Sequence, residues 1–498
     1  QTRERLRTFT GNYVMKKIIV SVLLVAMLLS FAACGGNGNS DITTSGSTTT
    51  ASVATVDPDE SFELPAESSD YSGKFIILNG FSSATTLFTT CTMVSEDGGA
   101  GDALDTAIYR RSIIMKDRYG VDIRELPVAV SQQYSTVEKD RNSSSHSFDI
   151  AMINTTNVAK LALGGYCYDL TTMDNISLEK AWWDQSANAQ LRYGQHLYYT
   201  YSDMDTTQFD SVRCIYFNQE LMRKHGMSTD ELYKKAIGGK WTLEEMYTYA
   251  KDVFEDNGDG ISDAEDIYPI VGVPSTTFSA LLSGCDAGYV KIDAATSLPY
   301  AYFTSERFGN VYDKILNVMF GENFFYTGCS KNTQATNMFV NGHALFLLTT
   351  IVSSNTMRQS MSADFGFLPL PKYDTDQEKY ICNAPNPYAI MVPSDSQNAD
   401  RTGFILEAMS YISHDTVRTA YFEVRLYGRT SRDALSWQTL DIIYSNIAYS
   451  VPVESSVNYQ SEINKMMVDN DRGISAYVAS VKGVVEADIK KFIDKVNQ

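Results

Sequence analysis

Strand-like and helix-like segments alternate along the chain, and this alternation is the strongest constraint on its fold. An apolar run predicts a buried strand at 74–79, and apolar residues at helical spacing predict a helix over 102–119 that ends at Gly120. Residues 121–126 and 148–153 predict two more strands. Strands that alternate with helices pair in parallel and bind ligands at their carboxyl ends, so the polar turns after 79 and 153 are candidate site loops.

The second half of the chain repeats this pattern. Strands are predicted at 212–217, 344–350 and 388–392, a helix at 305–320, and mostly helix from 401 onward. Capping boxes at 228–231 and 242–245 predict two helix starts, and 365–371 predicts an extended connector because each proline disfavours helix before it. The sequence therefore predicts an α/β protein with more than one strand–helix series.

The N-terminal region has the pattern of a lipoprotein export signal. The apolar run 18–31 follows Lys16 and Lys17, ends just before Cys34, and is shorter than the roughly 20 residues of a membrane-spanning helix. Lipidation of Cys34 would anchor the protein to the extracellular face of the cell membrane. The alternative is an ordinary secretory signal that is cut nearby.

Composition limits the partners of the exported chain. Residues 34–70 are rich in Gly, Ser, Thr and Asn and predict a flexible tether, while the remaining chain is long enough for two domains. The formal charge of −19 argues against nucleic acid or an anionic membrane surface as a partner, because both require a basic face.

Motifs for catalysis and for disulfides are weak. No HExxH, GxSxG or Walker pattern occurs, so we expect no enzyme activity. Cys285 and Cys329 are the best candidates for one disulfide, and we expect most of the other cysteines to be buried thiols.

Several short motifs, taken in order, resemble the sugar-type extracellular solute-binding proteins of bacterial ABC importers. The resemblance covers nearly all of the chain after the tether. Its motifs are Ile215–Asn218, Gly239–Thr242, Asn257–Gly260, Phe339–Phe346, Leu368–Asp374 with Gln377 and Tyr380, and Arg432-Asp433.

The resemblance implies a fold and a set of partners. It implies a two-lobed clamp of the periplasmic-binding-protein type, with segments that cross a hinge near 211–212 and 369–371. Lobe 1 would comprise 71–211 plus 372–415, and lobe 2 would comprise 212–371 plus 416–498. A small ligand would be held in the cleft, and closure would present both lobes to the permease subunits in the membrane. We expect a monomer.

A sugar site requires flat aromatic rings beside carboxylates or amides. Trp183 and Tyr216 are candidate rings, although core packing is the alternative for every aromatic residue. Asp203 lies in a loop that the resemblance favours. The predicted ligand-binding residues are Phe81, Asn154, Trp183, Asp203, Tyr216 and Arg429.

An acidic segment has the spacing of a calcium loop. Oxygen ligands recur around Gly260, with Ile261 offering a carbonyl, and a solvated acidic turn is the alternative. The predicted ligands are Glu255, Asn257, Asp259, Ile261, Asp263 and Asp266. The predicted function requires no cofactor, and Ca²⁺ is the one candidate ion.

These features predict a lipid-anchored receptor that captures a small solute, a mono- or oligosaccharide, for an ABC importer. Two alternatives stay open at this stage. One is a surface glycan hydrolase, because two catalytic carboxylates leave no local signature. The other is a peptide receptor with the same clamp.

Overall fold

A four-stranded sheet organises the first lobe. The computed structural model describes residues 70–81, 92–95, 97–293, 295–296, 298–423, 434–449 and 456–496. In the order β12-β3-β1-β2, β1 pairs in parallel with β2 and β3, and β12 is antiparallel to β3. These strands are Gly73–Phe81 (β1), Val121–Ala129 (β2), Ile150–Asn154 (β3) and Tyr388–Met391 (β12).

A five-stranded sheet organises the second lobe. In the order β10-β4-β9-β5-β8, β9, β5 and β8 are parallel, while β4 is antiparallel to β9 and β10. The strands are Arg213–Asn218 (β4), Tyr268–Val271 (β5), Phe325–Tyr326 (β8), Ala344–Thr350 (β9) and Phe365–Leu368 (β10). Two short ladders pair Lys291–Ile292 (β6) with Pro299–Tyr300 (β7), and Cys382–Asn383 (β11) with Ile447–Ala448 (β13).

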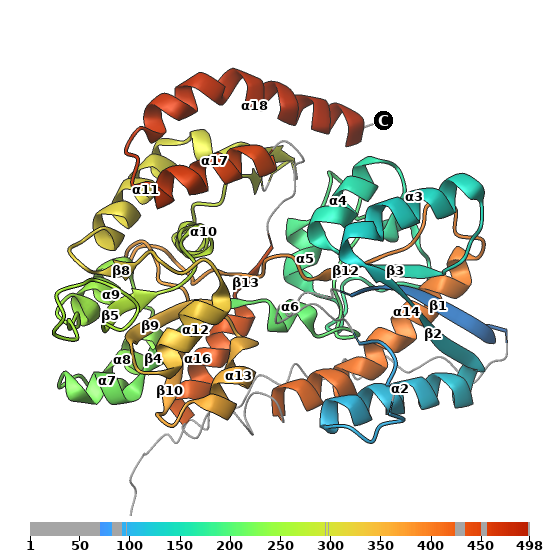
Figure 1. Ribbon diagram of the computed structural model, residues 1–498. Coiled ribbons are helices and arrows are strands. Elements are labelled where there is room, and N and C mark those ends of the chain that lie inside the picture. The colour runs from blue at the N-terminus through green and yellow to red at the C-terminus, as the bar shows by residue number, and fades with distance from the viewer. Residues whose placement is uncertain are drawn as a thin grey trace, which may run out of the picture. The chain divides into compact units, whose positions relative to one another are not determined.

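Helices surround both sheets (Figure 1). Around the first sheet lie Ala103–Tyr119 (α2), Gln133–Ser143 (α3), Thr155–Leu163 (α4), Gln185–Gln190 (α5), Thr207–Asp210 (α6) and Ala399–Ser413 (α14). Around the second lie Gln219–Lys224 (α7), Thr229–Ile237 (α8), Leu243–Ala250 (α9), Pro274–Gly284 (α10), Glu306–Met319 (α11), Asn332–Val340 (α12), Ser353–Ser360 (α13), Ala434–Ser445 (α16), Ser456–Val468 (α17) and Ile474–Val496 (α18).

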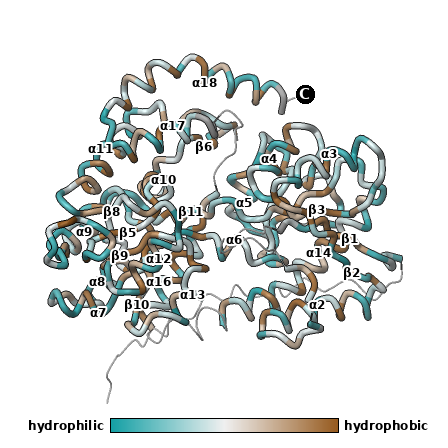
Figure 2. The backbone as a smooth tube through the Cα atoms, in the orientation of Figure 1, coloured by the Kyte–Doolittle hydropathy of each residue, from teal (hydrophilic) through white to brown (hydrophobic). Residues whose placement is uncertain are grey.

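Apolar side chains fill the space between the sheets and their helices. Every residue of β9 is buried, and α11 buries Phe308, Val311, Tyr312 and Ile315, which recur at helical spacing. Figure 2 shows hydrophobic residues concentrated along the strands of both sheets. One cluster of buried apolar residues covers one face of the first sheet, and a larger cluster extends from the other face of that sheet into the second lobe.

Local sequence signals account for several element ends. Asp102 caps α2 by accepting hydrogen bonds from the backbone N–H groups of Leu104 and Asp105, and Gly120 ends the helix with φ of 65°. The predicted helix at 102–119 is thereby confirmed, and the observed bounds of β1, β2, β3, β4, β9 and β12 confirm the six predicted strands. Both predicted helix starts are confirmed, because Ser228 and Thr242 accept from the backbone N–H groups of Glu231 and Glu245. At the second start the carboxylate of Glu245 pairs with Lys235.

The prediction of a disulfide between Cys285 and Cys329 is wrong. Cys285 and Cys329 are both buried free thiols, so the predicted bridge is absent among the described residues. Within the same residues, we find no helix with the length and apolar character needed to cross a bilayer. Cys34 and the predicted tether up to residue 69 lie outside the description.

Candidate functional site

Segments of chain run from one sheet to the other and position the candidate site. One segment leaves the first lobe and enters β4, another joins β10 to β12, and a third follows α14. Hydrogen bonds tie the first segment to the lobe 2 sheet: Val352 N–H donates to the Asp210 carbonyl and Ile351 N–H to the Val212 carbonyl. The predicted lobe boundaries at 211–212 and 371–372 fall within two of these segments.

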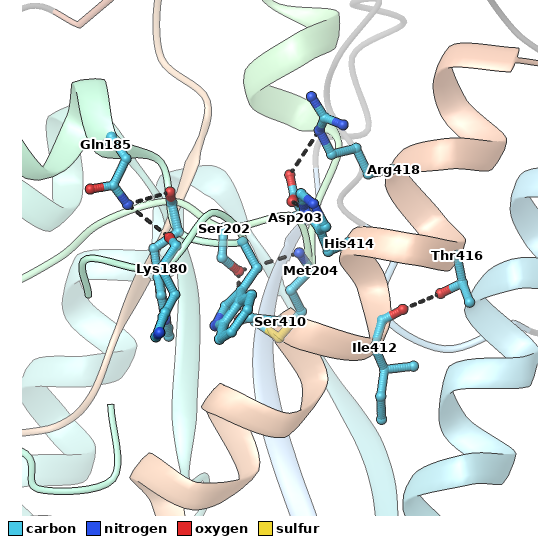
Figure 3. A network of polar contacts seen from close by, with 12 residues as sticks. Lys180, Gln185, Ser202, Asp203, Met204, Ser410, Ile412, His414, Thr416 and Arg418 are labelled. Atoms are coloured by element: carbon cyan, nitrogen blue, oxygen red, sulfur yellow. Dashed lines mark hydrogen bonds and ion pairs between the residues drawn. The ribbon is translucent and has the colours of Figure 1, made fainter. Parts of the chain in front are cut away.

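A polar network joins the first and third crossing segments (Figure 3). The buried carboxylate of Asp203 is hydrogen-bonded to Nδ1 of His414, and its Oδ1 lies 3.5 Å from Nε of Arg418. Burial raises the pKa of Asp203 above its usual value, while the His414 hydrogen bond and the Arg418 charge act in the opposite direction. About a third of the Arg418 side chain is exposed (36%), so its guanidinium is available to a polar ligand group.

The backbone beneath this network is itself unusual. His414–Arg418 form a π-helical turn directly after α14. Such turns are rare and frequently occur at functional sites. The wide turn places the side chains of His414 and Arg418 together on the Asp203 carboxylate.

A small hollow of about 160 Å³ borders Met204 and Val417, which adjoin this network in the chain, and we call it the strand-end hollow. It is lined by Thr92, Leu104, Asp105, Ile108, Met204, Thr206, Asp210 and Val417. The first half of α2 provides part of this wall, and α2 is the helix that follows the carboxyl end of β1. Asp210 connects the hollow to the carboxyl end of β9 through the Val352 hydrogen bond.

Elements of both lobes therefore meet near the strand-end hollow: the first half of α2 in lobe 1 and, through Asp210, the segment after β9 in lobe 2. In α/β sheets ligands bind at the carboxyl edge of the strands, because loops and helix N-termini converge there. Residues 82–91, which join β1 to Thr92, and residues 424–433, which follow the third crossing segment, lie outside the described part of the chain. Arg429 and the side chain of Phe81, both predicted to bind ligand, fall outside it as well.

The two predicted aromatic platforms are engaged in the lobe cores. Trp183 is 1% exposed, and its indole N–H donates to Oε2 of Glu407 at 2.9 Å. Tyr216 is fully buried, and its hydroxyl donates to the carbonyls of Thr350 and Ile351. Neither residue lines the strand-end hollow, so a ligand contact for either stays a prediction.

The two predicted polar residues lie at element ends. Asn154 is half-buried at the start of α4, where its side-chain oxygen accepts from the backbone N–H of Asn157 at 2.9 Å. Asp203 lies in the polar network beside Met204, a residue of the hollow. The structure brings Asp203 to the candidate site and gives Asn154 a capping role next to the carboxyl end of β3.

Sequence reasoning missed His414, Arg418 and Asp210. The first two are spaced four residues apart at the end of a long helical pattern, which places them on one helix face. That spacing is a detectable signal, but their shared partner Asp203 is 211 residues away from His414 in the chain. Asp210 carries no local signal.

The acidic loop is held together by its own backbone. Asp266 is fully buried, and its two carboxylate oxygens accept from the N–H groups of Asn257 and Asp263. Asp259 accepts from the N–H of Ile261, and Oε2 of Glu255 lies 2.5 Å from Nζ of Lys224. No group of three or more His, Cys, Asp or Glu side chains is placed to hold a metal within the described ranges.

Calcium binding at this loop therefore stays a prediction. Excess calcium added to chelator-treated protein would raise the melting temperature if the loop binds the ion. An unchanged melting temperature would contradict it.

A larger cavity of about 700 Å³, here called the interlobe cavity, shares no lining residue with the strand-end hollow. Its walls come from α5 in lobe 1 and from α10, the β6 segment and α17 in lobe 2, with β11 and β13 between them. The cavity meets α10 at Ser279 and Ser283, one and two turns beyond the helix start at Pro274. It therefore lies away from the strand end that α10 follows.

Comparison with solved structures identifies the fold. A cyclo/maltodextrin-binding protein in complex with maltotetraose is 14% identical, with a TM-score of 0.54 over 85% of this chain and 96% of that one. An ABC transporter solute-binding protein from Thermotoga lettingae, bound with α-D-tagatose, is 14% identical, with a TM-score of 0.51 over 85% and 100% of the two chains. UgpB from Mycobacterium tuberculosis, in complex with glycerophosphocholine, is 13% identical, with a TM-score of 0.53 over 85% and 100%.

No protein-family model matches the sequence, and no curated protein matches it. The structural matches nevertheless cover 85% of this chain and extend over nearly the whole length of each neighbour. This chain therefore has the two-lobed α/β fold of the solute-binding proteins of ABC transporters.

Proposed function

We propose that this protein is a lipid-anchored extracellular receptor that captures a mono- or oligosaccharide for an ABC importer. The observation that carries the proposal is the meeting of elements from both lobes at the Asp203–Arg418 network and the strand-end hollow, where α2 of lobe 1 and the segment after β9 of lobe 2 come together with the crossing segments. Two similarly folded proteins were solved with a carbohydrate, maltotetraose or α-D-tagatose, which supports this ligand class. The third was solved with glycerophosphocholine, so the fold also accepts a phosphorylated polyol.

The proposed output is a conformation and not a chemical product. A ligand that contacts both lobes binds the closed arrangement more tightly than the open one, so binding shifts the population toward closure. The permease subunits in the membrane would bind the surface that the closed conformation presents, and lipid on Cys34 would keep the receptor at the same membrane. No catalytic role is assigned to any residue.

A thermal-shift screen tests the ligand class. The panel should contain maltotetraose, α-D-tagatose, glycerophosphocholine and a set of short peptides. A carbohydrate present at 100 times its dissociation constant adds about 2.7 kcal/mol to the free energy of unfolding. If only peptides raise the melting temperature, the carbohydrate assignment is wrong, and if oligosaccharides are cleaved on incubation, the receptor assignment is wrong.

Two variants test the location of the site. Arg418→Ala removes the partly exposed guanidinium, and Thr206→Phe places a larger side chain in the wall of the strand-end hollow. We expect Arg418→Ala to weaken carbohydrate binding by about tenfold or more, since a hydrogen bond to a charged group contributes about 1.5–3 kcal/mol. We expect a loss of similar size from Thr206→Phe, because the new ring would occupy space that the ligand needs. Arg124→Ala, on an exposed arginine of β2, is the matched control and should bind normally.

A further inference from the structure

We propose that Arg111 is a positioning residue of the candidate site, because its guanidinium holds three separate segments of chain around the strand-end hollow. The inference rests on the proposed function, since it concerns how the ligand site of that function is built. Arg111 does not itself line the hollow, so its effect on a ligand would pass through the segments that it holds.

Arg111 is fully buried in the middle of α2, although arginine side chains are rarely fully buried unless they are paired. Its Nη1 donates to the carbonyl of Met204 at 2.7 Å and to Oγ of Ser413 at 3.0 Å, and its Nη2 donates to the carbonyl of Met93 at 2.8 Å. These partners are 93, 302 and 18 residues away from Arg111 in the chain. The planar guanidinium carries several N–H donors in a fixed geometry and can therefore hold several acceptors at once.

Two of the held segments carry residues of the hollow wall. Met204 lines the hollow, and Thr92, which also lines it, directly precedes Met93. Ile108, about one helical turn before Arg111 on α2, contributes a third part of the wall. The guanidinium therefore fixes Met204 and the segment at Thr92 relative to the wall that α2 provides.

Two of the held segments are also crossing segments. Met204 lies in the segment that enters β4, and Ser413 ends α14 directly before the π-helical turn His414–Arg418. Val417 of this turn lines the hollow as well. Arg111 therefore ties both segments to α2 on the lobe 1 side of the hinge, and the backbone rotation of closure would take place beyond these two points.

The carboxylate of Glu125 on β2 also holds the segment at Met93. Its Oε1 accepts from the backbone N–H groups of Met93 and Val94 and from Nδ2 of Asn79. Burial raises the pKa of this carboxyl above its usual value, while its hydrogen bonds and the positive charge of Arg111 act in the opposite direction. Met93 is thus held at its N–H by an acidic side chain and at its carbonyl by a basic one, which fixes the backbone of the segment that precedes α2.

Hydrogen exchange of the ligand-free full chain tests the positioning role, with the variants Arg111→Met and Ser413→Ala. Methionine is a long side chain without donors, so Arg111→Met leaves all three acceptors without the guanidinium. We expect amides of residues 92–95, 202–206 and 413–418 to exchange about tenfold or more faster in this variant, while amides of β3 keep their protection. Ser413→Ala removes one acceptor and should accelerate exchange only in residues 413–418.

Unequal loss of protection is what distinguishes a positioning role from a general loss of stability. Protection that is lost evenly throughout lobe 1 in Arg111→Met, or kept in all three segments, would overturn the proposal. Should Arg111→Met fail to fold, Ser413→Ala decides the question, and unchanged exchange in residues 413–418 would overturn it.

Calorimetric titration with maltotetraose and α-D-tagatose connects the positioning to the ligand site. For a probe that the wild type binds, Arg111→Met should weaken binding by about tenfold or more, and unchanged affinity would overturn the proposal. Arg110→Met, at the neighbouring exposed arginine of α2, is the matched control and should change neither exchange nor affinity. If the wild type binds no carbohydrate, the proposed function is wrong, and the exchange experiment still decides whether Arg111 holds the three segments.

Discussion

At the scale of single residues, Glu407 explains why lobe 1 buries two adjacent tryptophans. Its Oε1 accepts from the indole N–H of Trp182 at 3.0 Å, and its Oε2 accepts from that of Trp183 at 2.9 Å. The backbone N–H of Ser177 also donates to this carboxylate. One side chain of α14 thereby satisfies two buried indole donors and one half-buried backbone donor, which allows both rings to pack in the core.

The Glu407 carboxylate also makes stability depend on pH. Burial raises its pKa above the usual value, although the three hydrogen bonds act in the opposite direction. In the window just above the ordinary pKa of a glutamate, the folded state therefore binds more protons than the unfolded state, and stability falls as the pH rises. Glu407→Gln removes this dependence and, because an amide has a single acceptor oxygen, destabilises the protein by about 1–3 kcal/mol.

We therefore expect the gap in unfolding free energy between the wild type and Glu407→Gln to widen as the pH is lowered from about 7 to about 4. Urea unfolding at several pH values measures this gap. Glu486→Gln, on an exposed glutamate, should differ from the wild type by less than about 0.5 kcal/mol throughout. A gap that narrows on acidification would contradict the argument.

At the scale of elements, two glycines in lobe 2 have opposite roles. Gly366 lies in β10, where an added Cβ would approach the Tyr233 hydroxyl to 2.1 Å and Phe217 Cζ to 2.3 Å. Gly309 lies inside α11, where an added Cβ meets nothing within 4 Å. The first glycine is required by packing between the strand and its neighbours, whereas the second only weakens its helix.

Alanine substitutions distinguish these roles. Gly366→Ala should lower the free energy of unfolding by about 1–3 kcal/mol through overpacking. Gly309→Ala should raise it by about 0.5–1 kcal/mol because the unfolded chain loses conformational freedom. Chemical denaturation of both variants measures the two shifts, and equal shifts of the same sign would show that the packing at Gly366 is misjudged.

The last helix connects the two lobes. α18 packs against α11 of lobe 2, and near its other end Phe492 stacks on Tyr193 with ring centroids 5.3 Å apart. Tyr193 belongs to lobe 1, where its hydroxyl is 3.0 Å from that of Tyr199. A single helix therefore spans from one lobe to the other, as Figure 1 shows.

Phe492→Ala should release this contact. Deleting a buried aromatic side chain removes about 3–5 kcal/mol of local stability, so the amides of the second half of α18 should exchange faster with solvent. Amides at the start of α18, near Ile474, serve as the internal control and should keep their protection. Uniform exchange across the helix in both proteins would contradict an anchoring role for Phe492.

Local sequence patterns predicted helices and strands better than they predicted which side chains contact each other. The β1 and α2 segments were predictable because apolar spacing and the Gly120 end signal are read over a few residues. Trp183 and Tyr216 show the limit: each was a reasonable sugar platform, yet Glu407 lies 224 residues from Trp183 and Thr350 lies 134 residues from Tyr216. Only the folded chain reveals that these partners place both rings in cores.

At the level of the whole molecule, the proposed receptor function depends on movement between the two lobes. The crossing segments hold the Asp203 network at the strand ends, and the interlobe cavity lies between α5 and α10. A ligand that bridges the lobes should select one arrangement, since it binds that arrangement more tightly than the others.

The most direct test is the distance between spin labels at Lys139 of α3 and Asn337 of α12, two exposed residues on different lobes. Double electron–electron resonance would be recorded with and without the carbohydrate that most raises the melting temperature, with Cys34 and Cys91 replaced by serine. The account predicts that saturating carbohydrate shifts the distance distribution and narrows it. An identical distribution with and without bound carbohydrate would contradict the two-lobed receptor mechanism.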